Sequence, residues 1–258
     1  MKERLDKLIV SRGLVESREM AKALILEGKV FVNGEKITKA GTAVSEDAKI
    51  FLNEVDFPYV SRGGLKLESA INFFNINVSN RIIMDVGAST GGFTDCLLKM
   101  GAKKVFCIDV GYGQLAWLLR KDPRVIIMER TNVRYLDRID WHKDSRYRGQ
   151  DFEELKNRNI DMAVIDISFI SLKKVINAVL HFLNRNGEVL SLVKPQFEVG
   201  KGEVGRGGIV KDEDKRLKAV NDIQKHFESL GLKTIGVFKC PISGQKGNVE
   251  YFLYMVRL

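Results

Sequence analysis

The sequence RIIMDVGASTGGFTD at residues 81–95 joins an apolar run to a glycine-rich turn and to the start of a helix. The apolar run predicts a strand buried on both faces, as in a parallel sheet. Gly87, Gly91 and Gly92 allow a sharp turn and the close approach of a ligand, because a Cβ atom would clash there. Their spacing differs from the GxGxxG of dinucleotide-binding folds, and no Walker lysine follows. The stretch therefore predicts a site for a nucleoside cofactor other than NAD or ATP.

Strands and helices alternate around this stretch. Near-continuous apolar strands separated by helices predict a parallel sheet covered on both faces. About ten residues, CPISGQKGNV, join the last two strands, which is too short for a helical crossover, so these strands should pair antiparallel. We expect strands at 81–87, 104–110, 124–128, 162–168, 188–194, 234–238 and 249–256, and helices around 65–75, 92–101, 113–121, 171–184 and 212–230. The pattern predicts an α/β fold with a Rossmann-like sheet of six parallel strands and one antiparallel strand, the architecture of class I methyltransferases.

The first sixty residues show a different pattern. Leu5, Leu8 and Ile9 recur at helical spacing before a break at Gly13, and a second apolar set follows at 21–25. The run VFVNGEKI at 30–37 predicts a hairpin around its Asn-Gly turn. We therefore place a small α+β domain at 1–57. The segment 58–64, which follows with Pro58 and two glycines, is expected to be a linker, and the larger domain spans 65–258.

Composition limits the class of protein. Hydrophobic residues make up 45% and charged residues 29% of the chain, as in an ordinary globular protein. The net charge of +9 favours a polyanionic partner. The three cysteines are widely spaced and form no CxxC pair, so no metal site is expected and a reducing compartment is indicated. Neither a secretory signal nor a run of about 18 apolar residues is present, and a cytoplasmic location is expected.

Polar residues follow four of the predicted strands. Asp109 ends the second strand, where a carboxylate can accept hydrogen bonds from both hydroxyls of a ribose. Asn132 follows the third strand at the position expected for an adenine. Asp166 follows the fourth strand and Lys194 the fifth, and the carboxyl ends of parallel strands meet in one crevice. These residues should therefore surround a single ligand.

Methyl transfer to a ribose hydroxyl needs a base or a cation close to that hydroxyl, because the hydroxyl is a poor acid. Lys66, Asp166, Lys194 and Glu250 are placed to converge at the same edge of the sheet. Two lysines close together lower each other's pKa, so one of them can take a proton near neutral pH, held in place by the carboxylates. Proton abstraction by Lys194 and simple orientation of the hydroxyl both remain open.

Other methyl acceptors fit the sequence less well. Amino-methyltransferases carry a proline-containing turn after the fourth strand, whereas the turn here is Asp166-Ile-Ser-Phe169. Carbon-five pyrimidine methyltransferases need a cysteine near that strand, and Cys96, Cys107 and Cys240 all lie elsewhere in the sequence.

Several motifs together resemble a known family. Lys66, Asp166, Lys194 and Glu250 resemble the Lys-Asp-Lys-Glu tetrad of FtsJ/RrmJ-type ribose 2′-O-methyltransferases. The stretch RLDKLIVSRGLVESREMAKALILEGKVFVNG resembles the RNA-binding domain named after the fourth small-subunit ribosomal protein. In this order, joined by SRGGLKL and followed by DVGASTGGFTD, DISFISL and VKPQFE, they resemble the TlyA family over essentially the whole chain.

The resemblance implies S-adenosylmethionine as cofactor and 2′-O-methylation of cytidine in 16S or 23S ribosomal RNA, or in both, with ribosomal subunits as partners. It implies that Lys66, Asp166, Lys194 and Glu250 are catalytic. The cofactor-binding residues are expected to be Asp85, Gly87, Ser89, Gly91, Gly92, Phe93, Asp109 and Asn132. The RNA-binding residues, which lie on or beside the two N-terminal helices, are expected to be Arg4, Lys7, Arg12, Arg18 and Lys22.

Two other functions compete with this interpretation. One is a pore-forming haemolysin, an older name in the family, and the other is an RNA-binding assembly factor without catalysis. The intact glycine turn and tetrad favour the enzyme over both. Ser89-Thr90 stands where many FtsJ-type enzymes have Ala-Pro, but the glycines are retained. The target nucleotide, the ribosomal subunit and the oligomeric state are left open by the sequence.

Overall fold

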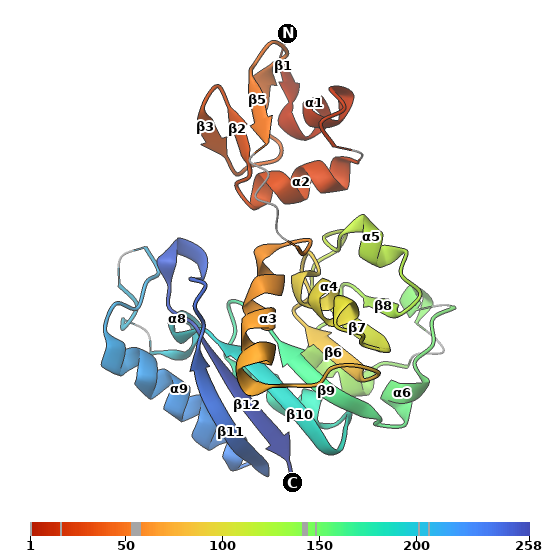
Figure 1. Cartoon of the computed structure of the whole chain (residues 1–258), viewed down its shortest axis with the longest axis vertical. Helices are drawn as coiled ribbons and strands as arrows, with labels where there is room; N and C mark the ends of the chain where they lie inside the picture. Colours follow the sequence, from red (N-terminus) through yellow and green to blue (C-terminus); the bar gives the residue numbers. More distant parts are fainter. Residues whose placement is uncertain are drawn as a thin grey trace.

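The computed structural model describes residues 2–15, 17–52, 58–140, 144–147, 149–200, 202–205 and 207–258. Figure 1 shows a small N-terminal part and a larger α/β part, with the N-terminal part in red and orange. Each part has its own hydrophobic core: one cluster lies entirely within residues 5–52, and two others lie within residues 59–255.

The N-terminal part contains the two helices and the hairpin that the sequence predicts. Ser17 caps the second helix by accepting a hydrogen bond from the Met20 amide at 3.2 Å. Asn33 and Gly34 have φ of 52° and 86°, as a tight hairpin turn requires. The elements are β1 (Lys2–Arg4), α1 (Leu5–Ser11), α2 (Arg18–Leu26), β2 (Val30–Val32), β3 (Glu35–Ile37), β4 (Ala43–Ser45) and β5 (Ile50–Leu52). Strand β1 pairs with β4, and β2 lies between β3 and β5. Strands β1, β4 and β5 were not predicted, because each has only three residues, too few to show an alternation of apolar and polar side chains.

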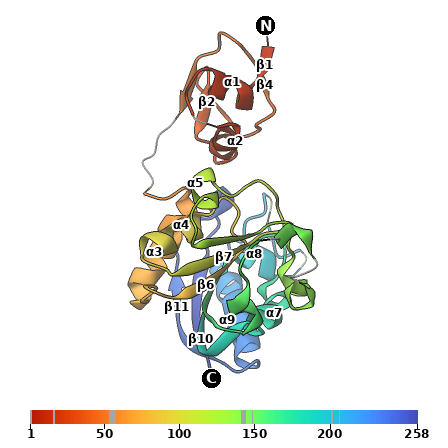
Figure 2. The same cartoon turned by 90° about the vertical axis from the view of Figure 1, so that its right-hand side faces the viewer.

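The larger part is built on a seven-stranded sheet (Figure 2). Its strands are β6 (Ile82–Val86), β7 (Lys104–Ile108), β8 (Val125–Met128), β9 (Ile160–Ile165), β10 (Leu183–Val193), β11 (Leu232–Lys239) and β12 (Tyr251–Arg257). The order is β11-β12-β10-β9-β6-β7-β8, and β12 runs antiparallel to both of its neighbours. The predicted fold of six parallel strands and one antiparallel strand is confirmed.

Helices cover both faces of this sheet. Met162 and Val164 of β9 pack in the cluster with α3 (Arg62–Phe74), α4 (Gly92–Lys99) and α5 (Trp117–Arg120). The alternate residues Ala163 and Ile165 pack in the cluster with α6 (Glu153–Lys156), α7 (Ile176–Leu180) and α9 (Glu213–Glu228). This two-residue alternation buries β9 on both sides, which explains its continuous apolar sequence.

Some elements differ from the prediction. The helix expected over 113–121 is only α5, since 110–116 form a loop. The helix expected over 171–184 is split into η3 (Leu172–Lys174) and α7, and β10 starts already at Leu183 and passes through an irregularity in which Asn186 has a φ of 63°. The remaining short elements are η1 (Val133–Arg138), η2 (Ser145–Tyr147), α8 (Pro195–Glu198) and η4 (Gln245–Gly247). Among the helices of the described residues, none has the length and apolarity to cross a membrane.

The predicted linker over 58–64 differs from the structure. Tyr59 is buried and lies against Gly64, where a Cβ atom would come within 2.3 Å of the tyrosine ring. The Val60 amide donates a hydrogen bond to Asp95 of α4 at 2.8 Å, and α3 already begins at Arg62. The glycines thus permit close packing here rather than flexibility, so 58–64 packs against the larger part. The preceding residues 53–57 lie outside the described residues.

Candidate active site

The glycine-rich turn after β6 brings two strand ends into close contact. Gly87 has a φ of 89°, and a Cβ atom on it would lie 2.3 Å from the carbonyl oxygen of Asp166. Its amide donates to the Ile108 carbonyl at 2.8 Å, while the Asp166 amide donates to Val86 at 2.9 Å. Only glycine satisfies both the left-handed backbone and this approach. The turn thereby joins the ends of β6, β7 and β9.

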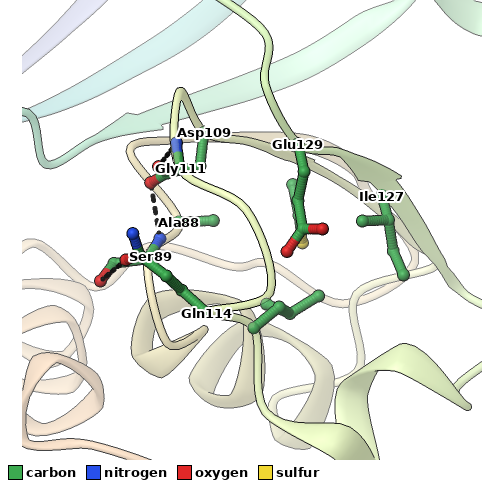
Figure 3. Close-up of a pocket in the computed structure, with 9 residues that line it drawn as sticks. Ala88, Ser89, Asp109, Gly111, Gln114, Ile127 and Glu129 are labelled. Carbon is green, nitrogen blue, oxygen red and sulfur yellow. Dashed lines mark hydrogen bonds between the residues drawn. The ribbon is translucent and has the colours of Figure 1, made fainter. Parts of the chain in front are cut away.

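Asp109 holds this turn to the loop after β7. Its Oδ2 accepts the Ser89 amide at 2.8 Å and its Oδ1 accepts the Gly111 amide at 2.6 Å (Figure 3). A carboxylate has about four acceptor positions, so two hydrogen bonds leave room for the hydroxyls of a ribose. The side chain is therefore fixed in place and still able to bind a ligand.

A pocket of about 360 Å³ opens at the carboxyl ends of β6, β7, β8 and β9. This is where open α/β sheets bind their ligands, and the size suits a nucleoside. Carboxylates of Asp109 and Asp166 lie at its wall, which favours a ligand that carries a positive charge. The lining consists of Val86, Gly87, Ser89, Ile108, Asp109, Val110, Gln114, Thr131, Asn132, Val133, Asp166, Ile167, Ser168, Phe169, Ile170 and Val175.

The expected cofactor residues divide into two groups. Gly87, Ser89, Asp109 and Asn132 line the pocket. The others lie behind the turn, and all four are buried in the domain: Asp85, Gly91, Gly92 and Phe93.

Asp85 differs most from the expectation. It is fully buried and accepts a hydrogen bond from the Thr94 hydroxyl at 2.6 Å, and its other oxygen has no hydrogen-bond partner. Burial raises the pKa of this carboxyl to about 7. Asp85 thus connects β6 to α4 instead of lining the pocket.

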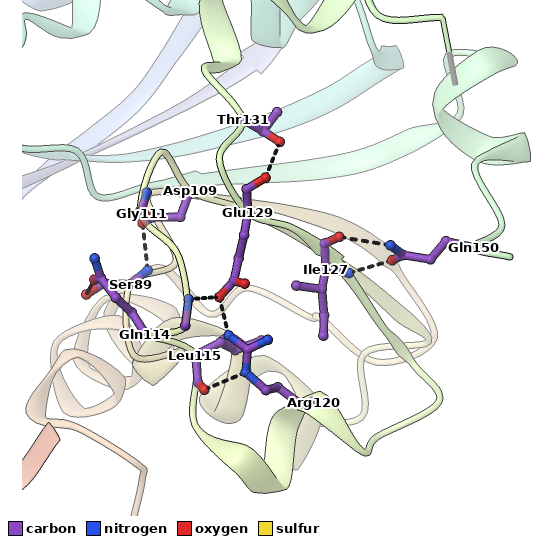
Figure 4. Close-up of polar contacts among 11 residues, drawn as sticks. Ser89, Asp109, Gly111, Gln114, Leu115, Arg120, Ile127, Glu129, Thr131 and Gln150 are labelled. Atoms are coloured by element: carbon purple, nitrogen blue, oxygen red, sulfur yellow. Dashed lines mark hydrogen bonds and ion pairs between the residues drawn. The ribbon is translucent and has the colours of Figure 1, made fainter. Parts of the chain in front are cut away.

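A smaller hollow adjoins the pocket and shares Ser89, Asp109 and Gln114 with it (Figure 3). Glu129, which directly follows β8, lines this hollow. Its carboxylate accepts the Gly113 amide at 2.9 Å and pairs with Arg120 (Figure 4). Glu129 and Gln114 were missed from the sequence; the available signal was that Glu129 follows β8 as Asp109 follows β7.

The four residues of the expected tetrad form two ion pairs. Lys66 Nζ donates to Glu250 Oε2 at 2.6 Å, and both side chains are buried. Lys194 Nζ lies 2.5 Å from Asp166 Oδ1 and also donates to the Ser168 hydroxyl at 2.9 Å. Each ammonium therefore has a carboxylate of its own.

The strand register brings the two ion pairs together. Val193 of β10 lies opposite Tyr251 of β12, so the next residues, Lys194 and Glu250, flank the same position at the edge of the sheet. The buried thiol of Cys240 lies close to residues of both ion pairs. Burial raises its pKa, and the charges of Lys66, Glu250 and Asp166 all act on it. The arrangement is a largely buried, charge-balanced group that borders the pocket through Asp166.

Comparison with known proteins supports this interpretation of the fold. Residues 59–257 match the model of FtsJ-like methyltransferases, and residues 3–50 match the S4 domain. The chain belongs to the FtsJ-like methyltransferase family. Within that family its relatives are TlyA proteins, so the expected TlyA membership is confirmed.

Three similar proteins show how closely this FtsJ-like methyltransferase resembles its relatives. The 16S/23S rRNA (cytidine-2′-O)-methyltransferase TlyA of Mycobacterium tuberculosis is 44% identical, over 98% of this chain and 89% of the relative. Hemolysin A of Brachyspira hyodysenteriae is 40% identical, over 98% and 99% of the two chains. A solved structure from Streptococcus thermophilus is 39% identical and has a TM-score of 0.71, covering 99% of this chain and 88% of that one.

The pocket of this FtsJ-like methyltransferase fits S-adenosylmethionine, the cofactor of the family. Gly87 exposes its backbone to the pocket because it carries no side chain. Asp109, Asn132 and Asp166 also line the pocket, and Asp166 joins it to the ion pair with Lys194. The chain is an S-adenosylmethionine-dependent methyltransferase.

Proposed function

We propose that this methyltransferase modifies the 2′-hydroxyl of a cytidine in ribosomal RNA. The observation that carries the proposal is that one residue, Asp166, both lines the cofactor pocket and pairs with Lys194. A hydroxyl that contacts Lys194 is therefore next to the bound cofactor. This adjacency is what in-line transfer of a methyl group to a ribose requires.

Bound S-adenosylmethionine supplies a methyl group activated by the sulfonium. Lys194 donates one N–H to Ser168 and forms an ion pair with Asp166, so an N–H of its three remains for the ribose oxygen. Such a hydrogen bond orients a lone pair of that oxygen and stabilises the negative charge that develops on it, and the hydroxyl proton passes to water, or to Lys194 itself when that amine is neutral. Lys66 and Glu250 form the neighbouring buried ion pair. Asp166 fixes the position of the Lys194 ammonium.

Two observations support ribosomal RNA and cytidine as the substrate. The relatives from Mycobacterium tuberculosis and Campylobacter jejuni are named rRNA (cytidine-2′-O)-methyltransferases, and the latter is 31% identical over 96% of this chain. The S4 match adds a domain of the kind found in RNA-binding proteins, and the chain carries a net charge of +9.

The proposal is tested by transferring labelled methyl groups from S-adenosylmethionine to purified 16S- and 23S-containing subunits. We expect the label in 2′-O-methylcytidine, which makes its linkage resistant to alkaline hydrolysis. Label on a base would contradict the proposal. RNA binding without any transfer would instead favour the non-catalytic assembly factor.

We propose that the N-terminal domain binds RNA through the basic residues of α1 and α2. Three of the five expected contacts already have partners within the domain. Arg4 and Arg18 both donate to the buried carboxylate of Asp6, at 3.0 and 2.9 Å, and the hydrogen bond from Arg4 is the main reason that the pKa of Asp6 falls to about 2. Arg12 donates to the Ala48 carbonyl at 2.6 Å. Two guanidinium groups share the single carboxylate of Asp6, so this cluster keeps a net positive charge that can attract a phosphate.

Lys7 is the sharpest probe of this surface, because it is exposed on α1 and contributes nothing to the core. Lys7→Glu should weaken RNA binding and reduce the slope of log affinity against log salt by about 1, since a phosphate contact is lost. The matched control is Lys49→Glu, the same charge change at an exposed position beside the three-stranded sheet. Equal effects of the two variants, measured by filter binding across a salt series, would mean that net charge alone matters.

A further inference from the structure

Tyr112 and Arg130 form an exposed stack beside the cofactor pocket. Tyr112 follows β7 and keeps 68% of its surface accessible. The guanidinium carbon of Arg130, which follows β8, lies 4.1 Å from the centre of the tyrosine ring. Stacking with a guanidinium leaves part of the ring free for another planar group.

The backbone holds this stack in place before any ligand arrives. Arg130 has a φ of 52°, which is uncommon for a residue other than glycine and costs conformational energy. It is held there because its amide donates to the Gly111 carbonyl at 2.9 Å and its carbonyl accepts from Arg146 at 2.8 Å. The hydrogen bond from the Gly113 amide to Glu129 closes the same loop on its other side (Figure 4).

Arg130 differs from the arginines close to it in the sequence in its ionic contacts. Arg120, Arg124 and Arg146 each form an ion pair with an acidic side chain. In the part of the chain that the structure describes, no such ion pair is found for Arg130. Its guanidinium is therefore available to a phosphate, which it can bind through two parallel hydrogen bonds.

Further pairs of an aromatic ring with a cation occur within residues 117–138. The Lys121 ammonium lies 4.8 Å from the ring of Trp117, and the guanidinium groups of Arg134 and Arg138 lie 5.2 and 5.5 Å from the ring of Tyr135. Alternation of exposed rings with cations is typical of surfaces that bind single-stranded nucleic acid, because rings stack on bases and cations contact phosphates.

The stack of Tyr112 and Arg130 lies at the rim of the cofactor pocket, on the side of β7 and β8. Its two loops also supply one wall of the pocket, through Asp109, Val110 and Asn132. The opposite wall is the loop of Asp166, which ends in Phe169 at 88% exposure. A chain of RNA with its acceptor ribose at Lys194 would thus have neighbouring nucleotides at the rim where Tyr112 and Arg130 lie.

We propose that Tyr112 and Arg130 bind an unpaired nucleotide of the RNA substrate close to the methylated one, the base stacking on Tyr112 and the phosphate contacting Arg130. The proposal rests on RNA being the acceptor, as argued above. It adds a second RNA-binding surface, on the methyltransferase domain itself, to the one on α1 and α2.

The test uses the full-length protein with S-adenosylhomocysteine and a fluorescein-labelled single-stranded RNA of about 12 nucleotides, read by fluorescence anisotropy. Tyr112→Ala should weaken binding by about 5- to 150-fold, the usual worth of one stacked base, and Tyr112→Phe should bind like the wild type. Arg130→Ala should also weaken binding and reduce the salt slope by about 0.7. The matched control is Arg185→Ala, because Arg185 is exposed in the irregular part of β10, at the opposite end of that strand from Lys194.

Two results would overturn the proposal. One is unchanged RNA affinity in Tyr112→Ala, provided that its melting temperature matches that of the wild type. The other is a loss of S-adenosylhomocysteine affinity by calorimetry with RNA affinity intact, which would make the stack a cover for the cofactor. If Tyr112→Ala fails to fold, Tyr112→Leu decides, since it keeps a large apolar side chain but removes the planar ring, and wild-type RNA affinity in a folded Tyr112→Leu would contradict stacking. Binding is measured without methyl transfer, so the outcome is independent of whether ribose is the acceptor.

Discussion

Lys194→Ala is expected to slow methyl transfer to ribosomal RNA by about a thousandfold while affinity for S-adenosylmethionine changes little. The estimate follows from the usual contribution of a general acid or base to the rate, which is about 10²- to 10⁴-fold. Lys194 contacts Asp166 and Ser168 but does not line the cofactor pocket itself, so its loss leaves the binding residues in place. The effect should therefore appear in kcat and not in cofactor binding.

Lys194→Arg should not restore the rate. A guanidinium is planar, longer and unable to give up its proton, so it can neither act as a base nor fit between Asp166 and Ser168. The matched control is Lys103→Ala. Lys103 is an exposed lysine directly before β7, at the amino-terminal ends of the parallel strands and so opposite to the end at which Lys194 lies. Turnover is measured with labelled cofactor and ribosomal subunits.

The pH profile separates the two roles of Lys194. A rate that rises with pH in the wild type and loses that rise in Lys194→Ala indicates proton abstraction, whereas a flat profile indicates orientation. Near-normal turnover in Lys194→Ala would place the chemistry elsewhere and argue against ribose as the acceptor.

The sheet and the edge at which the site lies could be predicted because strand periodicity and glycine spacing are local signals. The order of the strands was not predicted. The rule that parallel strands end on one side of the sheet explains why Asp166 and Lys194 converge, and the antiparallel pairing of β12 with β10 adds Glu250. The expectation that each carboxylate holds an ammonium agrees with the two ion pairs, although the catalytic roles themselves remain a prediction.

What the sequence did not reveal depends on the direction of individual side chains. Asp85 is one residue from the end of β6, and the alternation of the strand turns it toward Thr94 of α4 and away from the pocket. Gln114, Glu129 and Ser168 lie in loops, whose conformation is set by contacts with other loops. The double glycine at 63–64 resembled a flexible linker because sequence alone does not distinguish glycines that permit close packing from those that loosen a chain.

Gly87→Val is expected to reduce affinity for S-adenosylmethionine by up to about 100-fold. A Cβ atom at this position would lie 2.3 Å from the carbonyl oxygen and 2.9 Å from the carbonyl carbon of Asp166, and a backbone group cannot move aside as a flexible side chain can. The loop of Asp166 would have to shift, and this loop forms one wall of the pocket. Overpacking of this kind costs up to about 3 kcal/mol, which corresponds to about a hundredfold in affinity.

The matched control for this prediction is Gly231→Val. Gly231 has a φ of 86°, close to the 89° of Gly87, but a Cβ atom on Gly231 would have no neighbouring atom within 4 Å, and this glycine follows α9 outside the pocket. Both variants therefore bear the same backbone strain, and only Gly87→Val has the collision. Calorimetry with S-adenosylmethionine should show lost binding in Gly87→Val and wild-type affinity in Gly231→Val, with thermal unfolding confirming that both are folded. If Gly87→Val proves unfolded, the smaller Gly87→Ala is measured in its place. A folded Gly87 variant with wild-type affinity would mean that the cofactor does not approach this turn, and the pocket assignment would then be wrong.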